Sequence, residues 1–99
     1  MKSKCEIEMD FSRAVSQAEE LETLSKELNK MAVEHIRGAL KMLMFSWQGD
    51  SADKFFEKGD VLTNEMLETA DDLIKVAKNI KTTANIVYNA EKAAIQIGL

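Results

Sequence analysis

The sequence predicts an all-α protein in which two long helices form an antiparallel hairpin. The 99-residue chain contains no proline, and apolar residues recur at steps of three and four in both of its halves. No stretch has the strict alternation of apolar and polar residues that is typical of a half-buried strand. One strong break, Ser46–Ser51, divides the chain near its middle and predicts the turn between the helices.

The first helix is predicted from about Asp10 to Ser46. Its apolar residues fall at helical spacing, and toward the end of the segment they spread almost around the helix. The residues that set this spacing are Phe11, Val15, Ala18, Leu21, Leu24, Leu28, Met31, Ala32, Ile36, Ala39, Leu40 and Leu43.

The turn is predicted at Trp47–Asp50. Gly49 can adopt the left-handed conformation that ends a helix, because it has no side chain. Asp50 or Ser51 can then cap the next helix with a side-chain oxygen. The sequence contains no linker and no low-complexity tract, so residues 1–99 are predicted to form a single domain.

The second helix is predicted from about Ser51 to Ile95. Steps of four and three alternate along it, and this 3.5-residue period is typical of a helix that packs nearly parallel or antiparallel to another. The many alanines in this seam predict a close approach of the partner helix. The seam comprises Ala52, Phe56, Gly59, Thr63, Met66, Ala70, Leu73, Ala77, Ile80, Ala84, Val87, Glu91 and Ala94.

A second apolar stripe runs beside the seam and includes Phe55, Ile74 and Tyr88. A hairpin gives each helix one partner, so two stripes per helix predict a second partner. The sequence leaves open which stripe faces the hairpin and which faces another subunit. The residues expected to pack within the hairpin or across a dimer are Leu24, Leu28, Met31, Phe55, Phe56, Met66, Leu73, Ile74, Ile80 and Val87.

The composition argues against several functional classes. The net charge is −4 and the pI is about 5.0, whereas a protein that neutralises nucleic-acid phosphates is normally basic. The single cysteine, Cys5, cannot form an internal disulfide. The single histidine, His35, has no companions at metal-ligand spacing, and no catalytic constellation is visible. We therefore expect no enzyme, no cofactor and no metal site.

The first ten residues carry acids where a signal peptide needs an apolar core. The longest run of large apolar residues, Met42–Phe45, is far shorter than the roughly 20 residues that cross a membrane. We therefore expect no integral membrane segment and no export by the general secretory route.

Trp47-Gln48-Gly49, midway along a chain of 99 residues, resembles the WXG family, the small ESAT-like helical-hairpin proteins of type VII secretion. Ala52 and Phe55 fit the small and aromatic residues that commonly follow this turn in the family. The resemblance covers essentially the whole chain. It implies a dimeric antiparallel four-helix bundle that a membrane-embedded type VII export ATPase recognises, mainly in actinobacteria and Firmicutes.

The resemblance also implies a C-terminal export signal of the form Tyr-x-x-x-Asp/Glu. In this chain the acid Glu91 stands third after Tyr88, and Lys92 occupies the fourth position. Residues three and four apart share a helix face, so Tyr88 and Glu91 form the candidate export signal. The shifted acid leaves open that the chain depends on a partner's signal.

Two functions follow from these expectations. The first is a secreted, virulence-associated type VII substrate that acts through protein–protein contacts. It would be exported from a cytoplasmic pool as a folded homodimer and would need no signal peptide. The alternative is a cytosolic targeting partner that forms a heterodimer with the helical N-terminal segment of a larger type VII toxin. A small enzyme or a DNA-binding helical protein, the third class considered, has no supporting motif.

Overall fold

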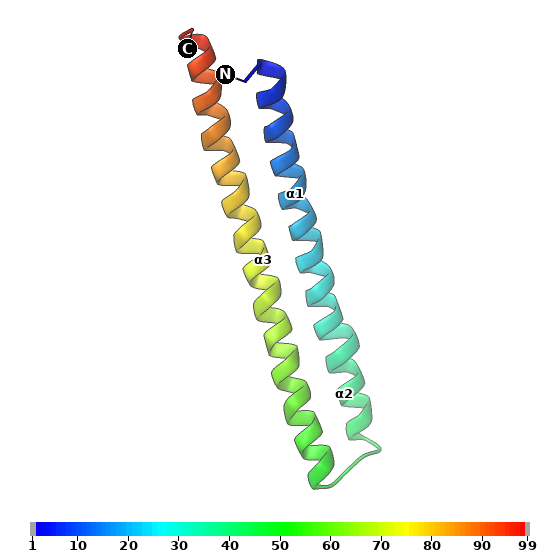
Figure 1. Cartoon of the computed structure of the whole chain (residues 1–99). Helices are drawn as coiled ribbons and strands as arrows, with labels where there is room; N and C mark the ends of the chain where they lie inside the picture. The colour runs from blue at the N-terminus through cyan, green and yellow to red at the C-terminus, as the bar shows by residue number, and fades with distance from the viewer. Residues whose placement is uncertain (1, 99) are drawn as a thin grey trace. The chain divides into compact units, whose positions relative to one another are not determined.

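The computed structural model describes residues 2–98, which form an all-α helical hairpin (Figure 1). Helix α1, Lys4–Lys30, continues through a π-helical segment, η1, at Met31–Ile36 into helix α2, Arg37–Met44. Helix α3 spans Asp50–Gln96 and packs antiparallel to the first half. The fold class and the hairpin of two long helices are therefore confirmed.

The chain divides into two compact units. The terminal unit consists of Met1–Glu22 and Ile74–Leu99, and the turn unit consists of Thr23–Leu73. Each unit is built from a piece of the first helical half and the piece of α3 that pairs with it.

In the terminal unit, α1 begins at Lys4, six residues before the predicted start at Asp10. Ser3 caps the helix, because the Glu6 backbone N–H donates to Ser3 Oγ at 3.1 Å. Ile7 in the second turn is buried, so the additional turns add apolar contact to the unit. The Ser-x-x-Glu pattern at residues 3–6 is the sequence signature of such a start.

The buried core of both units consists mainly of small residues. Ala18 and Ala77 are buried in the terminal unit, and Ser25, Ala32 and Ala70 are buried in the turn unit. The Ser25 hydroxyl donates to the Ala70 carbonyl oxygen at 2.6 Å, a contact that requires the two helix backbones to lie close together. The alanines in the predicted seam of the second helix predict this close approach.

The packing face of α2 is narrower than predicted. Of the three α2 residues in the predicted apolar pattern, Leu40 is buried, whereas Ala39 and Leu43 are exposed. The physical reason is η1. A π-helical turn contains more residues than an α-helical turn, so η1 rotates the side chains of α2 about the helix axis.

The turn is slightly wider than predicted. Helix α2 ends at Met44, and α3 begins at Asp50. The Ser46 and Trp47 backbone N–H groups both donate to the Leu43 carbonyl oxygen, at 3.0 and 2.9 Å, and so satisfy the end of α2.

Candidate functional site

The first candidate region is the turn. Gly49 has a φ of 112°, in the region that favours glycine. Its carbonyl oxygen accepts the Asp53 backbone N–H at 2.9 Å, so Gly49 lies at the beginning of α3. The sequence placed it at the end of the first helix instead. The correction follows from the length of the turn, because Phe45 takes the capping position after α2.

Trp47 lies against two phenylalanines of the first turns of α3. Its ring centroid is 5.3 Å from that of Phe55 and 5.9 Å from that of Phe56. These distances and the tilted geometry are those of favourable aromatic pairs. The indole is still 38% exposed, so the ring both packs the turn and remains accessible at the surface.

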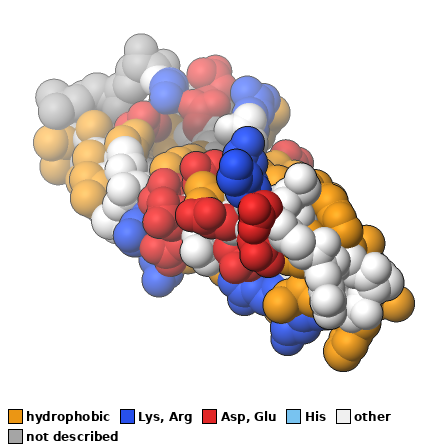
Figure 2. Space-filling model, turned by 90° about the horizontal axis from the view of Figure 1, so that it is seen from below, with side chains coloured by type: hydrophobic (Ala, Val, Ile, Leu, Met, Phe, Trp, Pro, Cys, Tyr) orange, Lys and Arg blue, Asp and Glu red, His pale blue; other side chains and the backbone are white. Residues whose placement is uncertain are grey.

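Further apolar side chains surround this turn and reach the surface. Figure 2, which views the molecule from the turn end, shows hydrophobic side chains among acidic and basic ones. Phe45 is 89% exposed, and Met42 and Met44 are also exposed. Methionine adapts its shape to different partners, so this surface suits protein contact.

The second candidate region contains Tyr88, in the terminal unit. The Tyr88 ring stacks on Phe11 with centroids 4.6 Å apart and an interplanar angle of 22°. Lys92 Nζ lies 5.1 Å from the centre of the Tyr88 ring and donates to the Tyr88 hydroxyl oxygen at 3.3 Å. Tyr88 is therefore a half-buried packing residue whose hydroxyl already has a partner.

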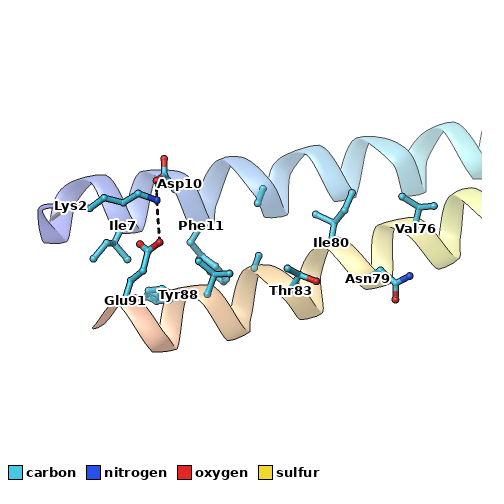
Figure 3. Close-up of a pocket in the computed structure, with 13 residues that line it drawn as sticks. Lys2, Ile7, Asp10, Phe11, Val76, Asn79, Ile80, Thr83, Tyr88 and Glu91 are labelled. Carbon is cyan, nitrogen blue, oxygen red and sulfur yellow. Dashed lines mark hydrogen bonds and ion pairs between the residues drawn. The ribbon is translucent and has the colours of Figure 1, made fainter. Parts of the chain in front are cut away.

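Glu91, the second member of the candidate export signal, is held by a cation from the chain terminus. Lys2 Nζ donates to Glu91 Oε1 at 3.1 Å and lies 2.9 Å from Asp10 Oδ2 (Figure 3). The two carboxylates, Asp10 first, raise the pKa of Lys2, and the hydrogen bond from Lys2 lowers the pKa of Asp10. Glu91 in the apolar seam is thus compensated by Lys2.

A groove of about 440 Å³ runs between α1 and α3 in the terminal unit (Figure 3). Apolar side chains form most of its wall, and the charged groups Lys2, Asp10 and Glu91 stand at one end. The apolar wall comprises Ile7, Phe11, Ala14, Val76, Ile80, Ala84 and Val87. The groove joins the predicted seam of α3 to residues of α1 that precede or begin the predicted first helix.

The residues predicted to pack within the hairpin or across a dimer fall into two groups. The half-buried group, which packs within the units, comprises Leu28, Phe56, Met66, Leu73, Ile74 and Ile80. The exposed group comprises Leu24, Met31, Phe55 and Val87. Leu24 is 51% exposed, so it is not a core residue of the hairpin. Small residues occupy the closest contact between the helices, and the larger side chains beside them are therefore pushed toward the surface.

Sequence reasoning missed Lys2, Ile7 and the Phe11–Tyr88 stack. The apolar pattern of the predicted first helix continues toward the N-terminus from Ala18 through Ala14 and Phe11 to Ile7, at steps of four and three. This spacing was the available signal for Ile7. No comparable signal exists for Lys2, because its partner Glu91 is 89 residues away in the chain.

No group of three or more His, Cys, Asp and Glu side chains within residues 2–98 is arranged to hold a metal ion. Among the described helices, none is both long and apolar enough to span a membrane. Comparison with protein-family models, with curated proteins and with solved structures finds no match to this chain.

Proposed function

We propose that the chain is a WXG-type, ESAT-like protein without enzymatic activity, which dimerises and is exported in folded form by a type VII secretion machine. The proposal joins the Trp47-Gln48-Gly49 turn to an all-α hairpin of 99 residues. Its mechanism is presentation, in which assembled apolar and aromatic surfaces are offered to protein partners.

The observation that carries the proposal is the uncovered apolar wall of the terminal-unit groove. Val76 and Val87 line this groove, and each remains about half exposed in the single chain. A helix pair that exposes a row of large aliphatic side chains favours a further helical partner, because burying them removes apolar surface from water. A second copy supplies two more helices and completes a four-helix bundle.

Dimerisation also affects how a composite signal forms. In an antiparallel pair of hairpins, the turn of one subunit lies toward the chain ends of the other. Trp47 of one subunit and Tyr88 of its partner would then be presented together, so that export depends on correct assembly.

The first test is the mass of the purified chain, measured by light scattering across a dilution series in reducing buffer. A stable helical species of twice 11.1 kDa supports the proposal. Val87→Asp places a charge in the groove wall and should convert this species to monomer. Ile86→Asp is the matched control, since Ile86 is exposed but does not line the groove. A monomeric wild-type chain, or equal effects of the two variants, contradicts dimerisation through the groove.

The second test is export itself, in the source organism with and without its type VII ATPase. We expect the chain in the culture medium only when the ATPase is present, and Trp47→Ala or Tyr88→Ala should reduce the exported amount. Circular dichroism of each variant separates loss of export from loss of folding. Export that persists without the ATPase contradicts the proposal.

A second candidate function is a cytosolic targeting partner for a larger type VII toxin. The favouring observation is that Lys92 occupies the fourth position after Tyr88 and binds its hydroxyl, while Lys2 binds Glu91. Such a chain would depend on a signal from its partner. Co-expression with the helical N-terminal segment of a neighbouring toxin gene tests this. A soluble one-to-one complex that replaces the homodimer supports it, and a homodimer that excludes the segment contradicts it.

A further inference from the structure

The register of the turn unit changes within the first helical half. Ser25 and Ala32 are buried and stand seven residues apart, which is the heptad spacing of helices in a nearly parallel seam. The next buried residue, Leu40, comes eight residues after Ala32. On the facing helix, the buried residues Thr63 and Ala70 stand seven apart, and the buried Ala52, eleven residues before Thr63, keeps the same alternation of steps of four and three. One side of the seam therefore carries one residue more than the other.

The π-helical segment η1, Met31–Ile36, contains this extra residue. Its hydrogen-bonding pattern is visible at its end, where the Arg37 backbone N–H donates to the Ala32 carbonyl oxygen, five residues earlier. An α-helix would use the carbonyl four residues earlier. The hairpin thus absorbs the insertion inside a helix rather than in the turn.

The insertion places Leu40 against Gly59. A Cβ atom at position 59 would lie 2.6 Å from Leu40 Cδ1 and 2.8 Å from Leu40 Cδ2, so the leucine occupies the space that a side chain would need. Leu40 is 8% exposed, whereas Leu43 is 39% exposed. Gly59, one of the non-apolar members of the predicted seam, therefore leaves the space into which the Leu40 side chain packs.

The sequence also contains apolar residues at the positions that would face α3 if the first helical half had no π-helical segment. In a continuous α-helix, the seam position seven residues after Ala32 is Ala39, and the following one is Leu43. Both residues are apolar, so this second face of α2 could also pack on α3. The two registers differ by one residue, which is a rotation of about 100° and a shift of about 1.5 Å.

We propose that η1 is a register switch, through which α2 can pass between a Leu40-in register and a Leu43-in register while the hairpin stays folded. The Leu40-in register is the one observed, with the π-helical segment present. The Leu43-in register converts η1 to α-helix and exposes Leu40. Segments of π-helix inside α-helices often occur at functional sites, and two packed arrangements of one element are the usual basis of a switch.

The switch would change which leucine α2 offers to a partner. A partner that contacts the exposed Leu43 side stabilises the observed register only to the extent that it binds this register more tightly. The inference does not depend on type VII export, because it rests only on packing within the turn unit.

The test combines two changes in one cycle. Deletion of Glu34, an exposed residue of η1, removes the extra residue and leaves Leu40 at heptad spacing from Ala32. Gly59→Leu blocks the space that Leu40 occupies. Asp60→Leu introduces the same side chain at the exposed neighbouring position and is the matched control.

We expect the deletion variant to fold with native helicity and to keep contacts between the Leu40 methyl groups and Gly59, observed as nuclear Overhauser effects. Gly59→Leu should be tolerated in the full-length chain, with Ala39 facing Leu at position 59 and Leu43 withdrawn from solvent. In the deletion background the same substitution should lower the melting temperature several times more, because α2 has no second register left. Asp60→Leu should have similar small effects in both backgrounds.

Three results would overturn the switch. The deletion variant could fail to fold, which would mean that the hairpin requires the extra residue of η1 in order to pack. Gly59→Leu could lower the melting temperature equally in both backgrounds, which would exclude an alternative register. Leu40 could also keep its contacts with residue 59 in the full-length Gly59→Leu variant, which would show a side-chain adjustment instead of a helix rotation.

Discussion

Lys2 Nζ lies 3.1 Å from Glu91 Oε1, and this ion pair joins residues near opposite ends of the chain. Lys2 also binds Asp10, so one ammonium group links the start of α1 to the last turns of α3 in the terminal unit. The pair compensates a carboxylate in a mainly apolar seam, where an uncompensated charge is costly.

The Lys2 cluster predicts a dependence of stability on pH. Because Lys2 lowers the pKa of Asp10 below its ordinary 3.8, the cluster stabilises the fold above that pH and loses this effect as pH falls through the lowered pKa. The raised pKa of Lys2 gives the opposite limit, since the effect is lost as pH rises above 10.5 and through that pKa.

Melting temperatures of the wild type and of Lys2→Gln, measured from pH 2 to 8, test this prediction. The difference should be small near pH 7, as for other exposed ion pairs, and should vanish in acid. Lys4→Gln is the control, because no ion pair is observed for this exposed lysine among the described residues. A difference between wild type and Lys2→Gln that grows in acid would contradict the role of Asp10.

Gly49→Ala should lower the free energy of unfolding by about 1–2 kcal/mol, because a Cβ atom is unfavourable at positive φ. Gly38→Ala should instead raise it by about 0.5–1 kcal/mol, because alanine favours helix and nothing lies within 4 Å of the added Cβ. Urea unfolding followed by circular dichroism measures both. Equal effects of the two substitutions would be inconsistent with the observed turn.

Ser25→Leu should destabilise the fold by about 1–3 kcal/mol, because a large side chain does not fit where the Ser25 hydroxyl reaches the Ala70 carbonyl at 2.6 Å. Asn29→Leu, at an exposed position of the same helix, should change the stability by no more than about 0.5 kcal/mol. Thermal unfolding of the two variants compares them directly. If Ser25→Leu melts at the wild-type temperature, the helices do not approach as closely as described.

Phe56→Ala should lower the free energy of unfolding by about 1–2 kcal/mol, since this half-buried ring packs against Trp47. The fluorescence emission of Trp47, the single tryptophan, should shift to longer wavelength as its ring becomes more hydrated. Phe45→Ala is the control, because Phe45 is almost fully exposed and should leave stability within about 0.5 kcal/mol of wild type. An unchanged Trp47 emission in Phe56→Ala would contradict the aromatic cluster.

Much of the fold could be predicted because helical packing leaves a periodic pattern in a single segment. The alternating steps of four and three in the second half predicted α3, Asp50–Gln96, to within one residue at each end. Its seam includes Ala70 and Ala77, which are buried as the pattern indicates. The start of α1 was predicted six residues late, because neither the apolar spacing that includes Ile7 nor the Ser-x-x-Glu pattern at residues 3–6 was used.

The candidate site was predictable only in part. Trp47, Gly49 and Phe55 are neighbours in sequence, and the turn brings them together by a local path. Tyr88 and Glu91 are also close in sequence, yet their surroundings come from Phe11 and Lys2 of the opposite helix. Pattern within a segment does not identify such distant partners.

By itself, the sequence determined that this chain is helical, where it turns and that its second helix carries two apolar stripes; which stripe packs within the hairpin came from the tertiary structure. These properties depend on spacing within a segment, which helix geometry converts directly into a buried stripe. Only the tertiary structure decided that Lys2 compensates Glu91, that Leu24 is exposed and that Leu40 meets Gly59. The first two features depend on which residues face each other across the hairpin and on how closely the backbones approach, whereas the contact of Leu40 with Gly59 depends on η1, which shifts the register of α2 by one residue.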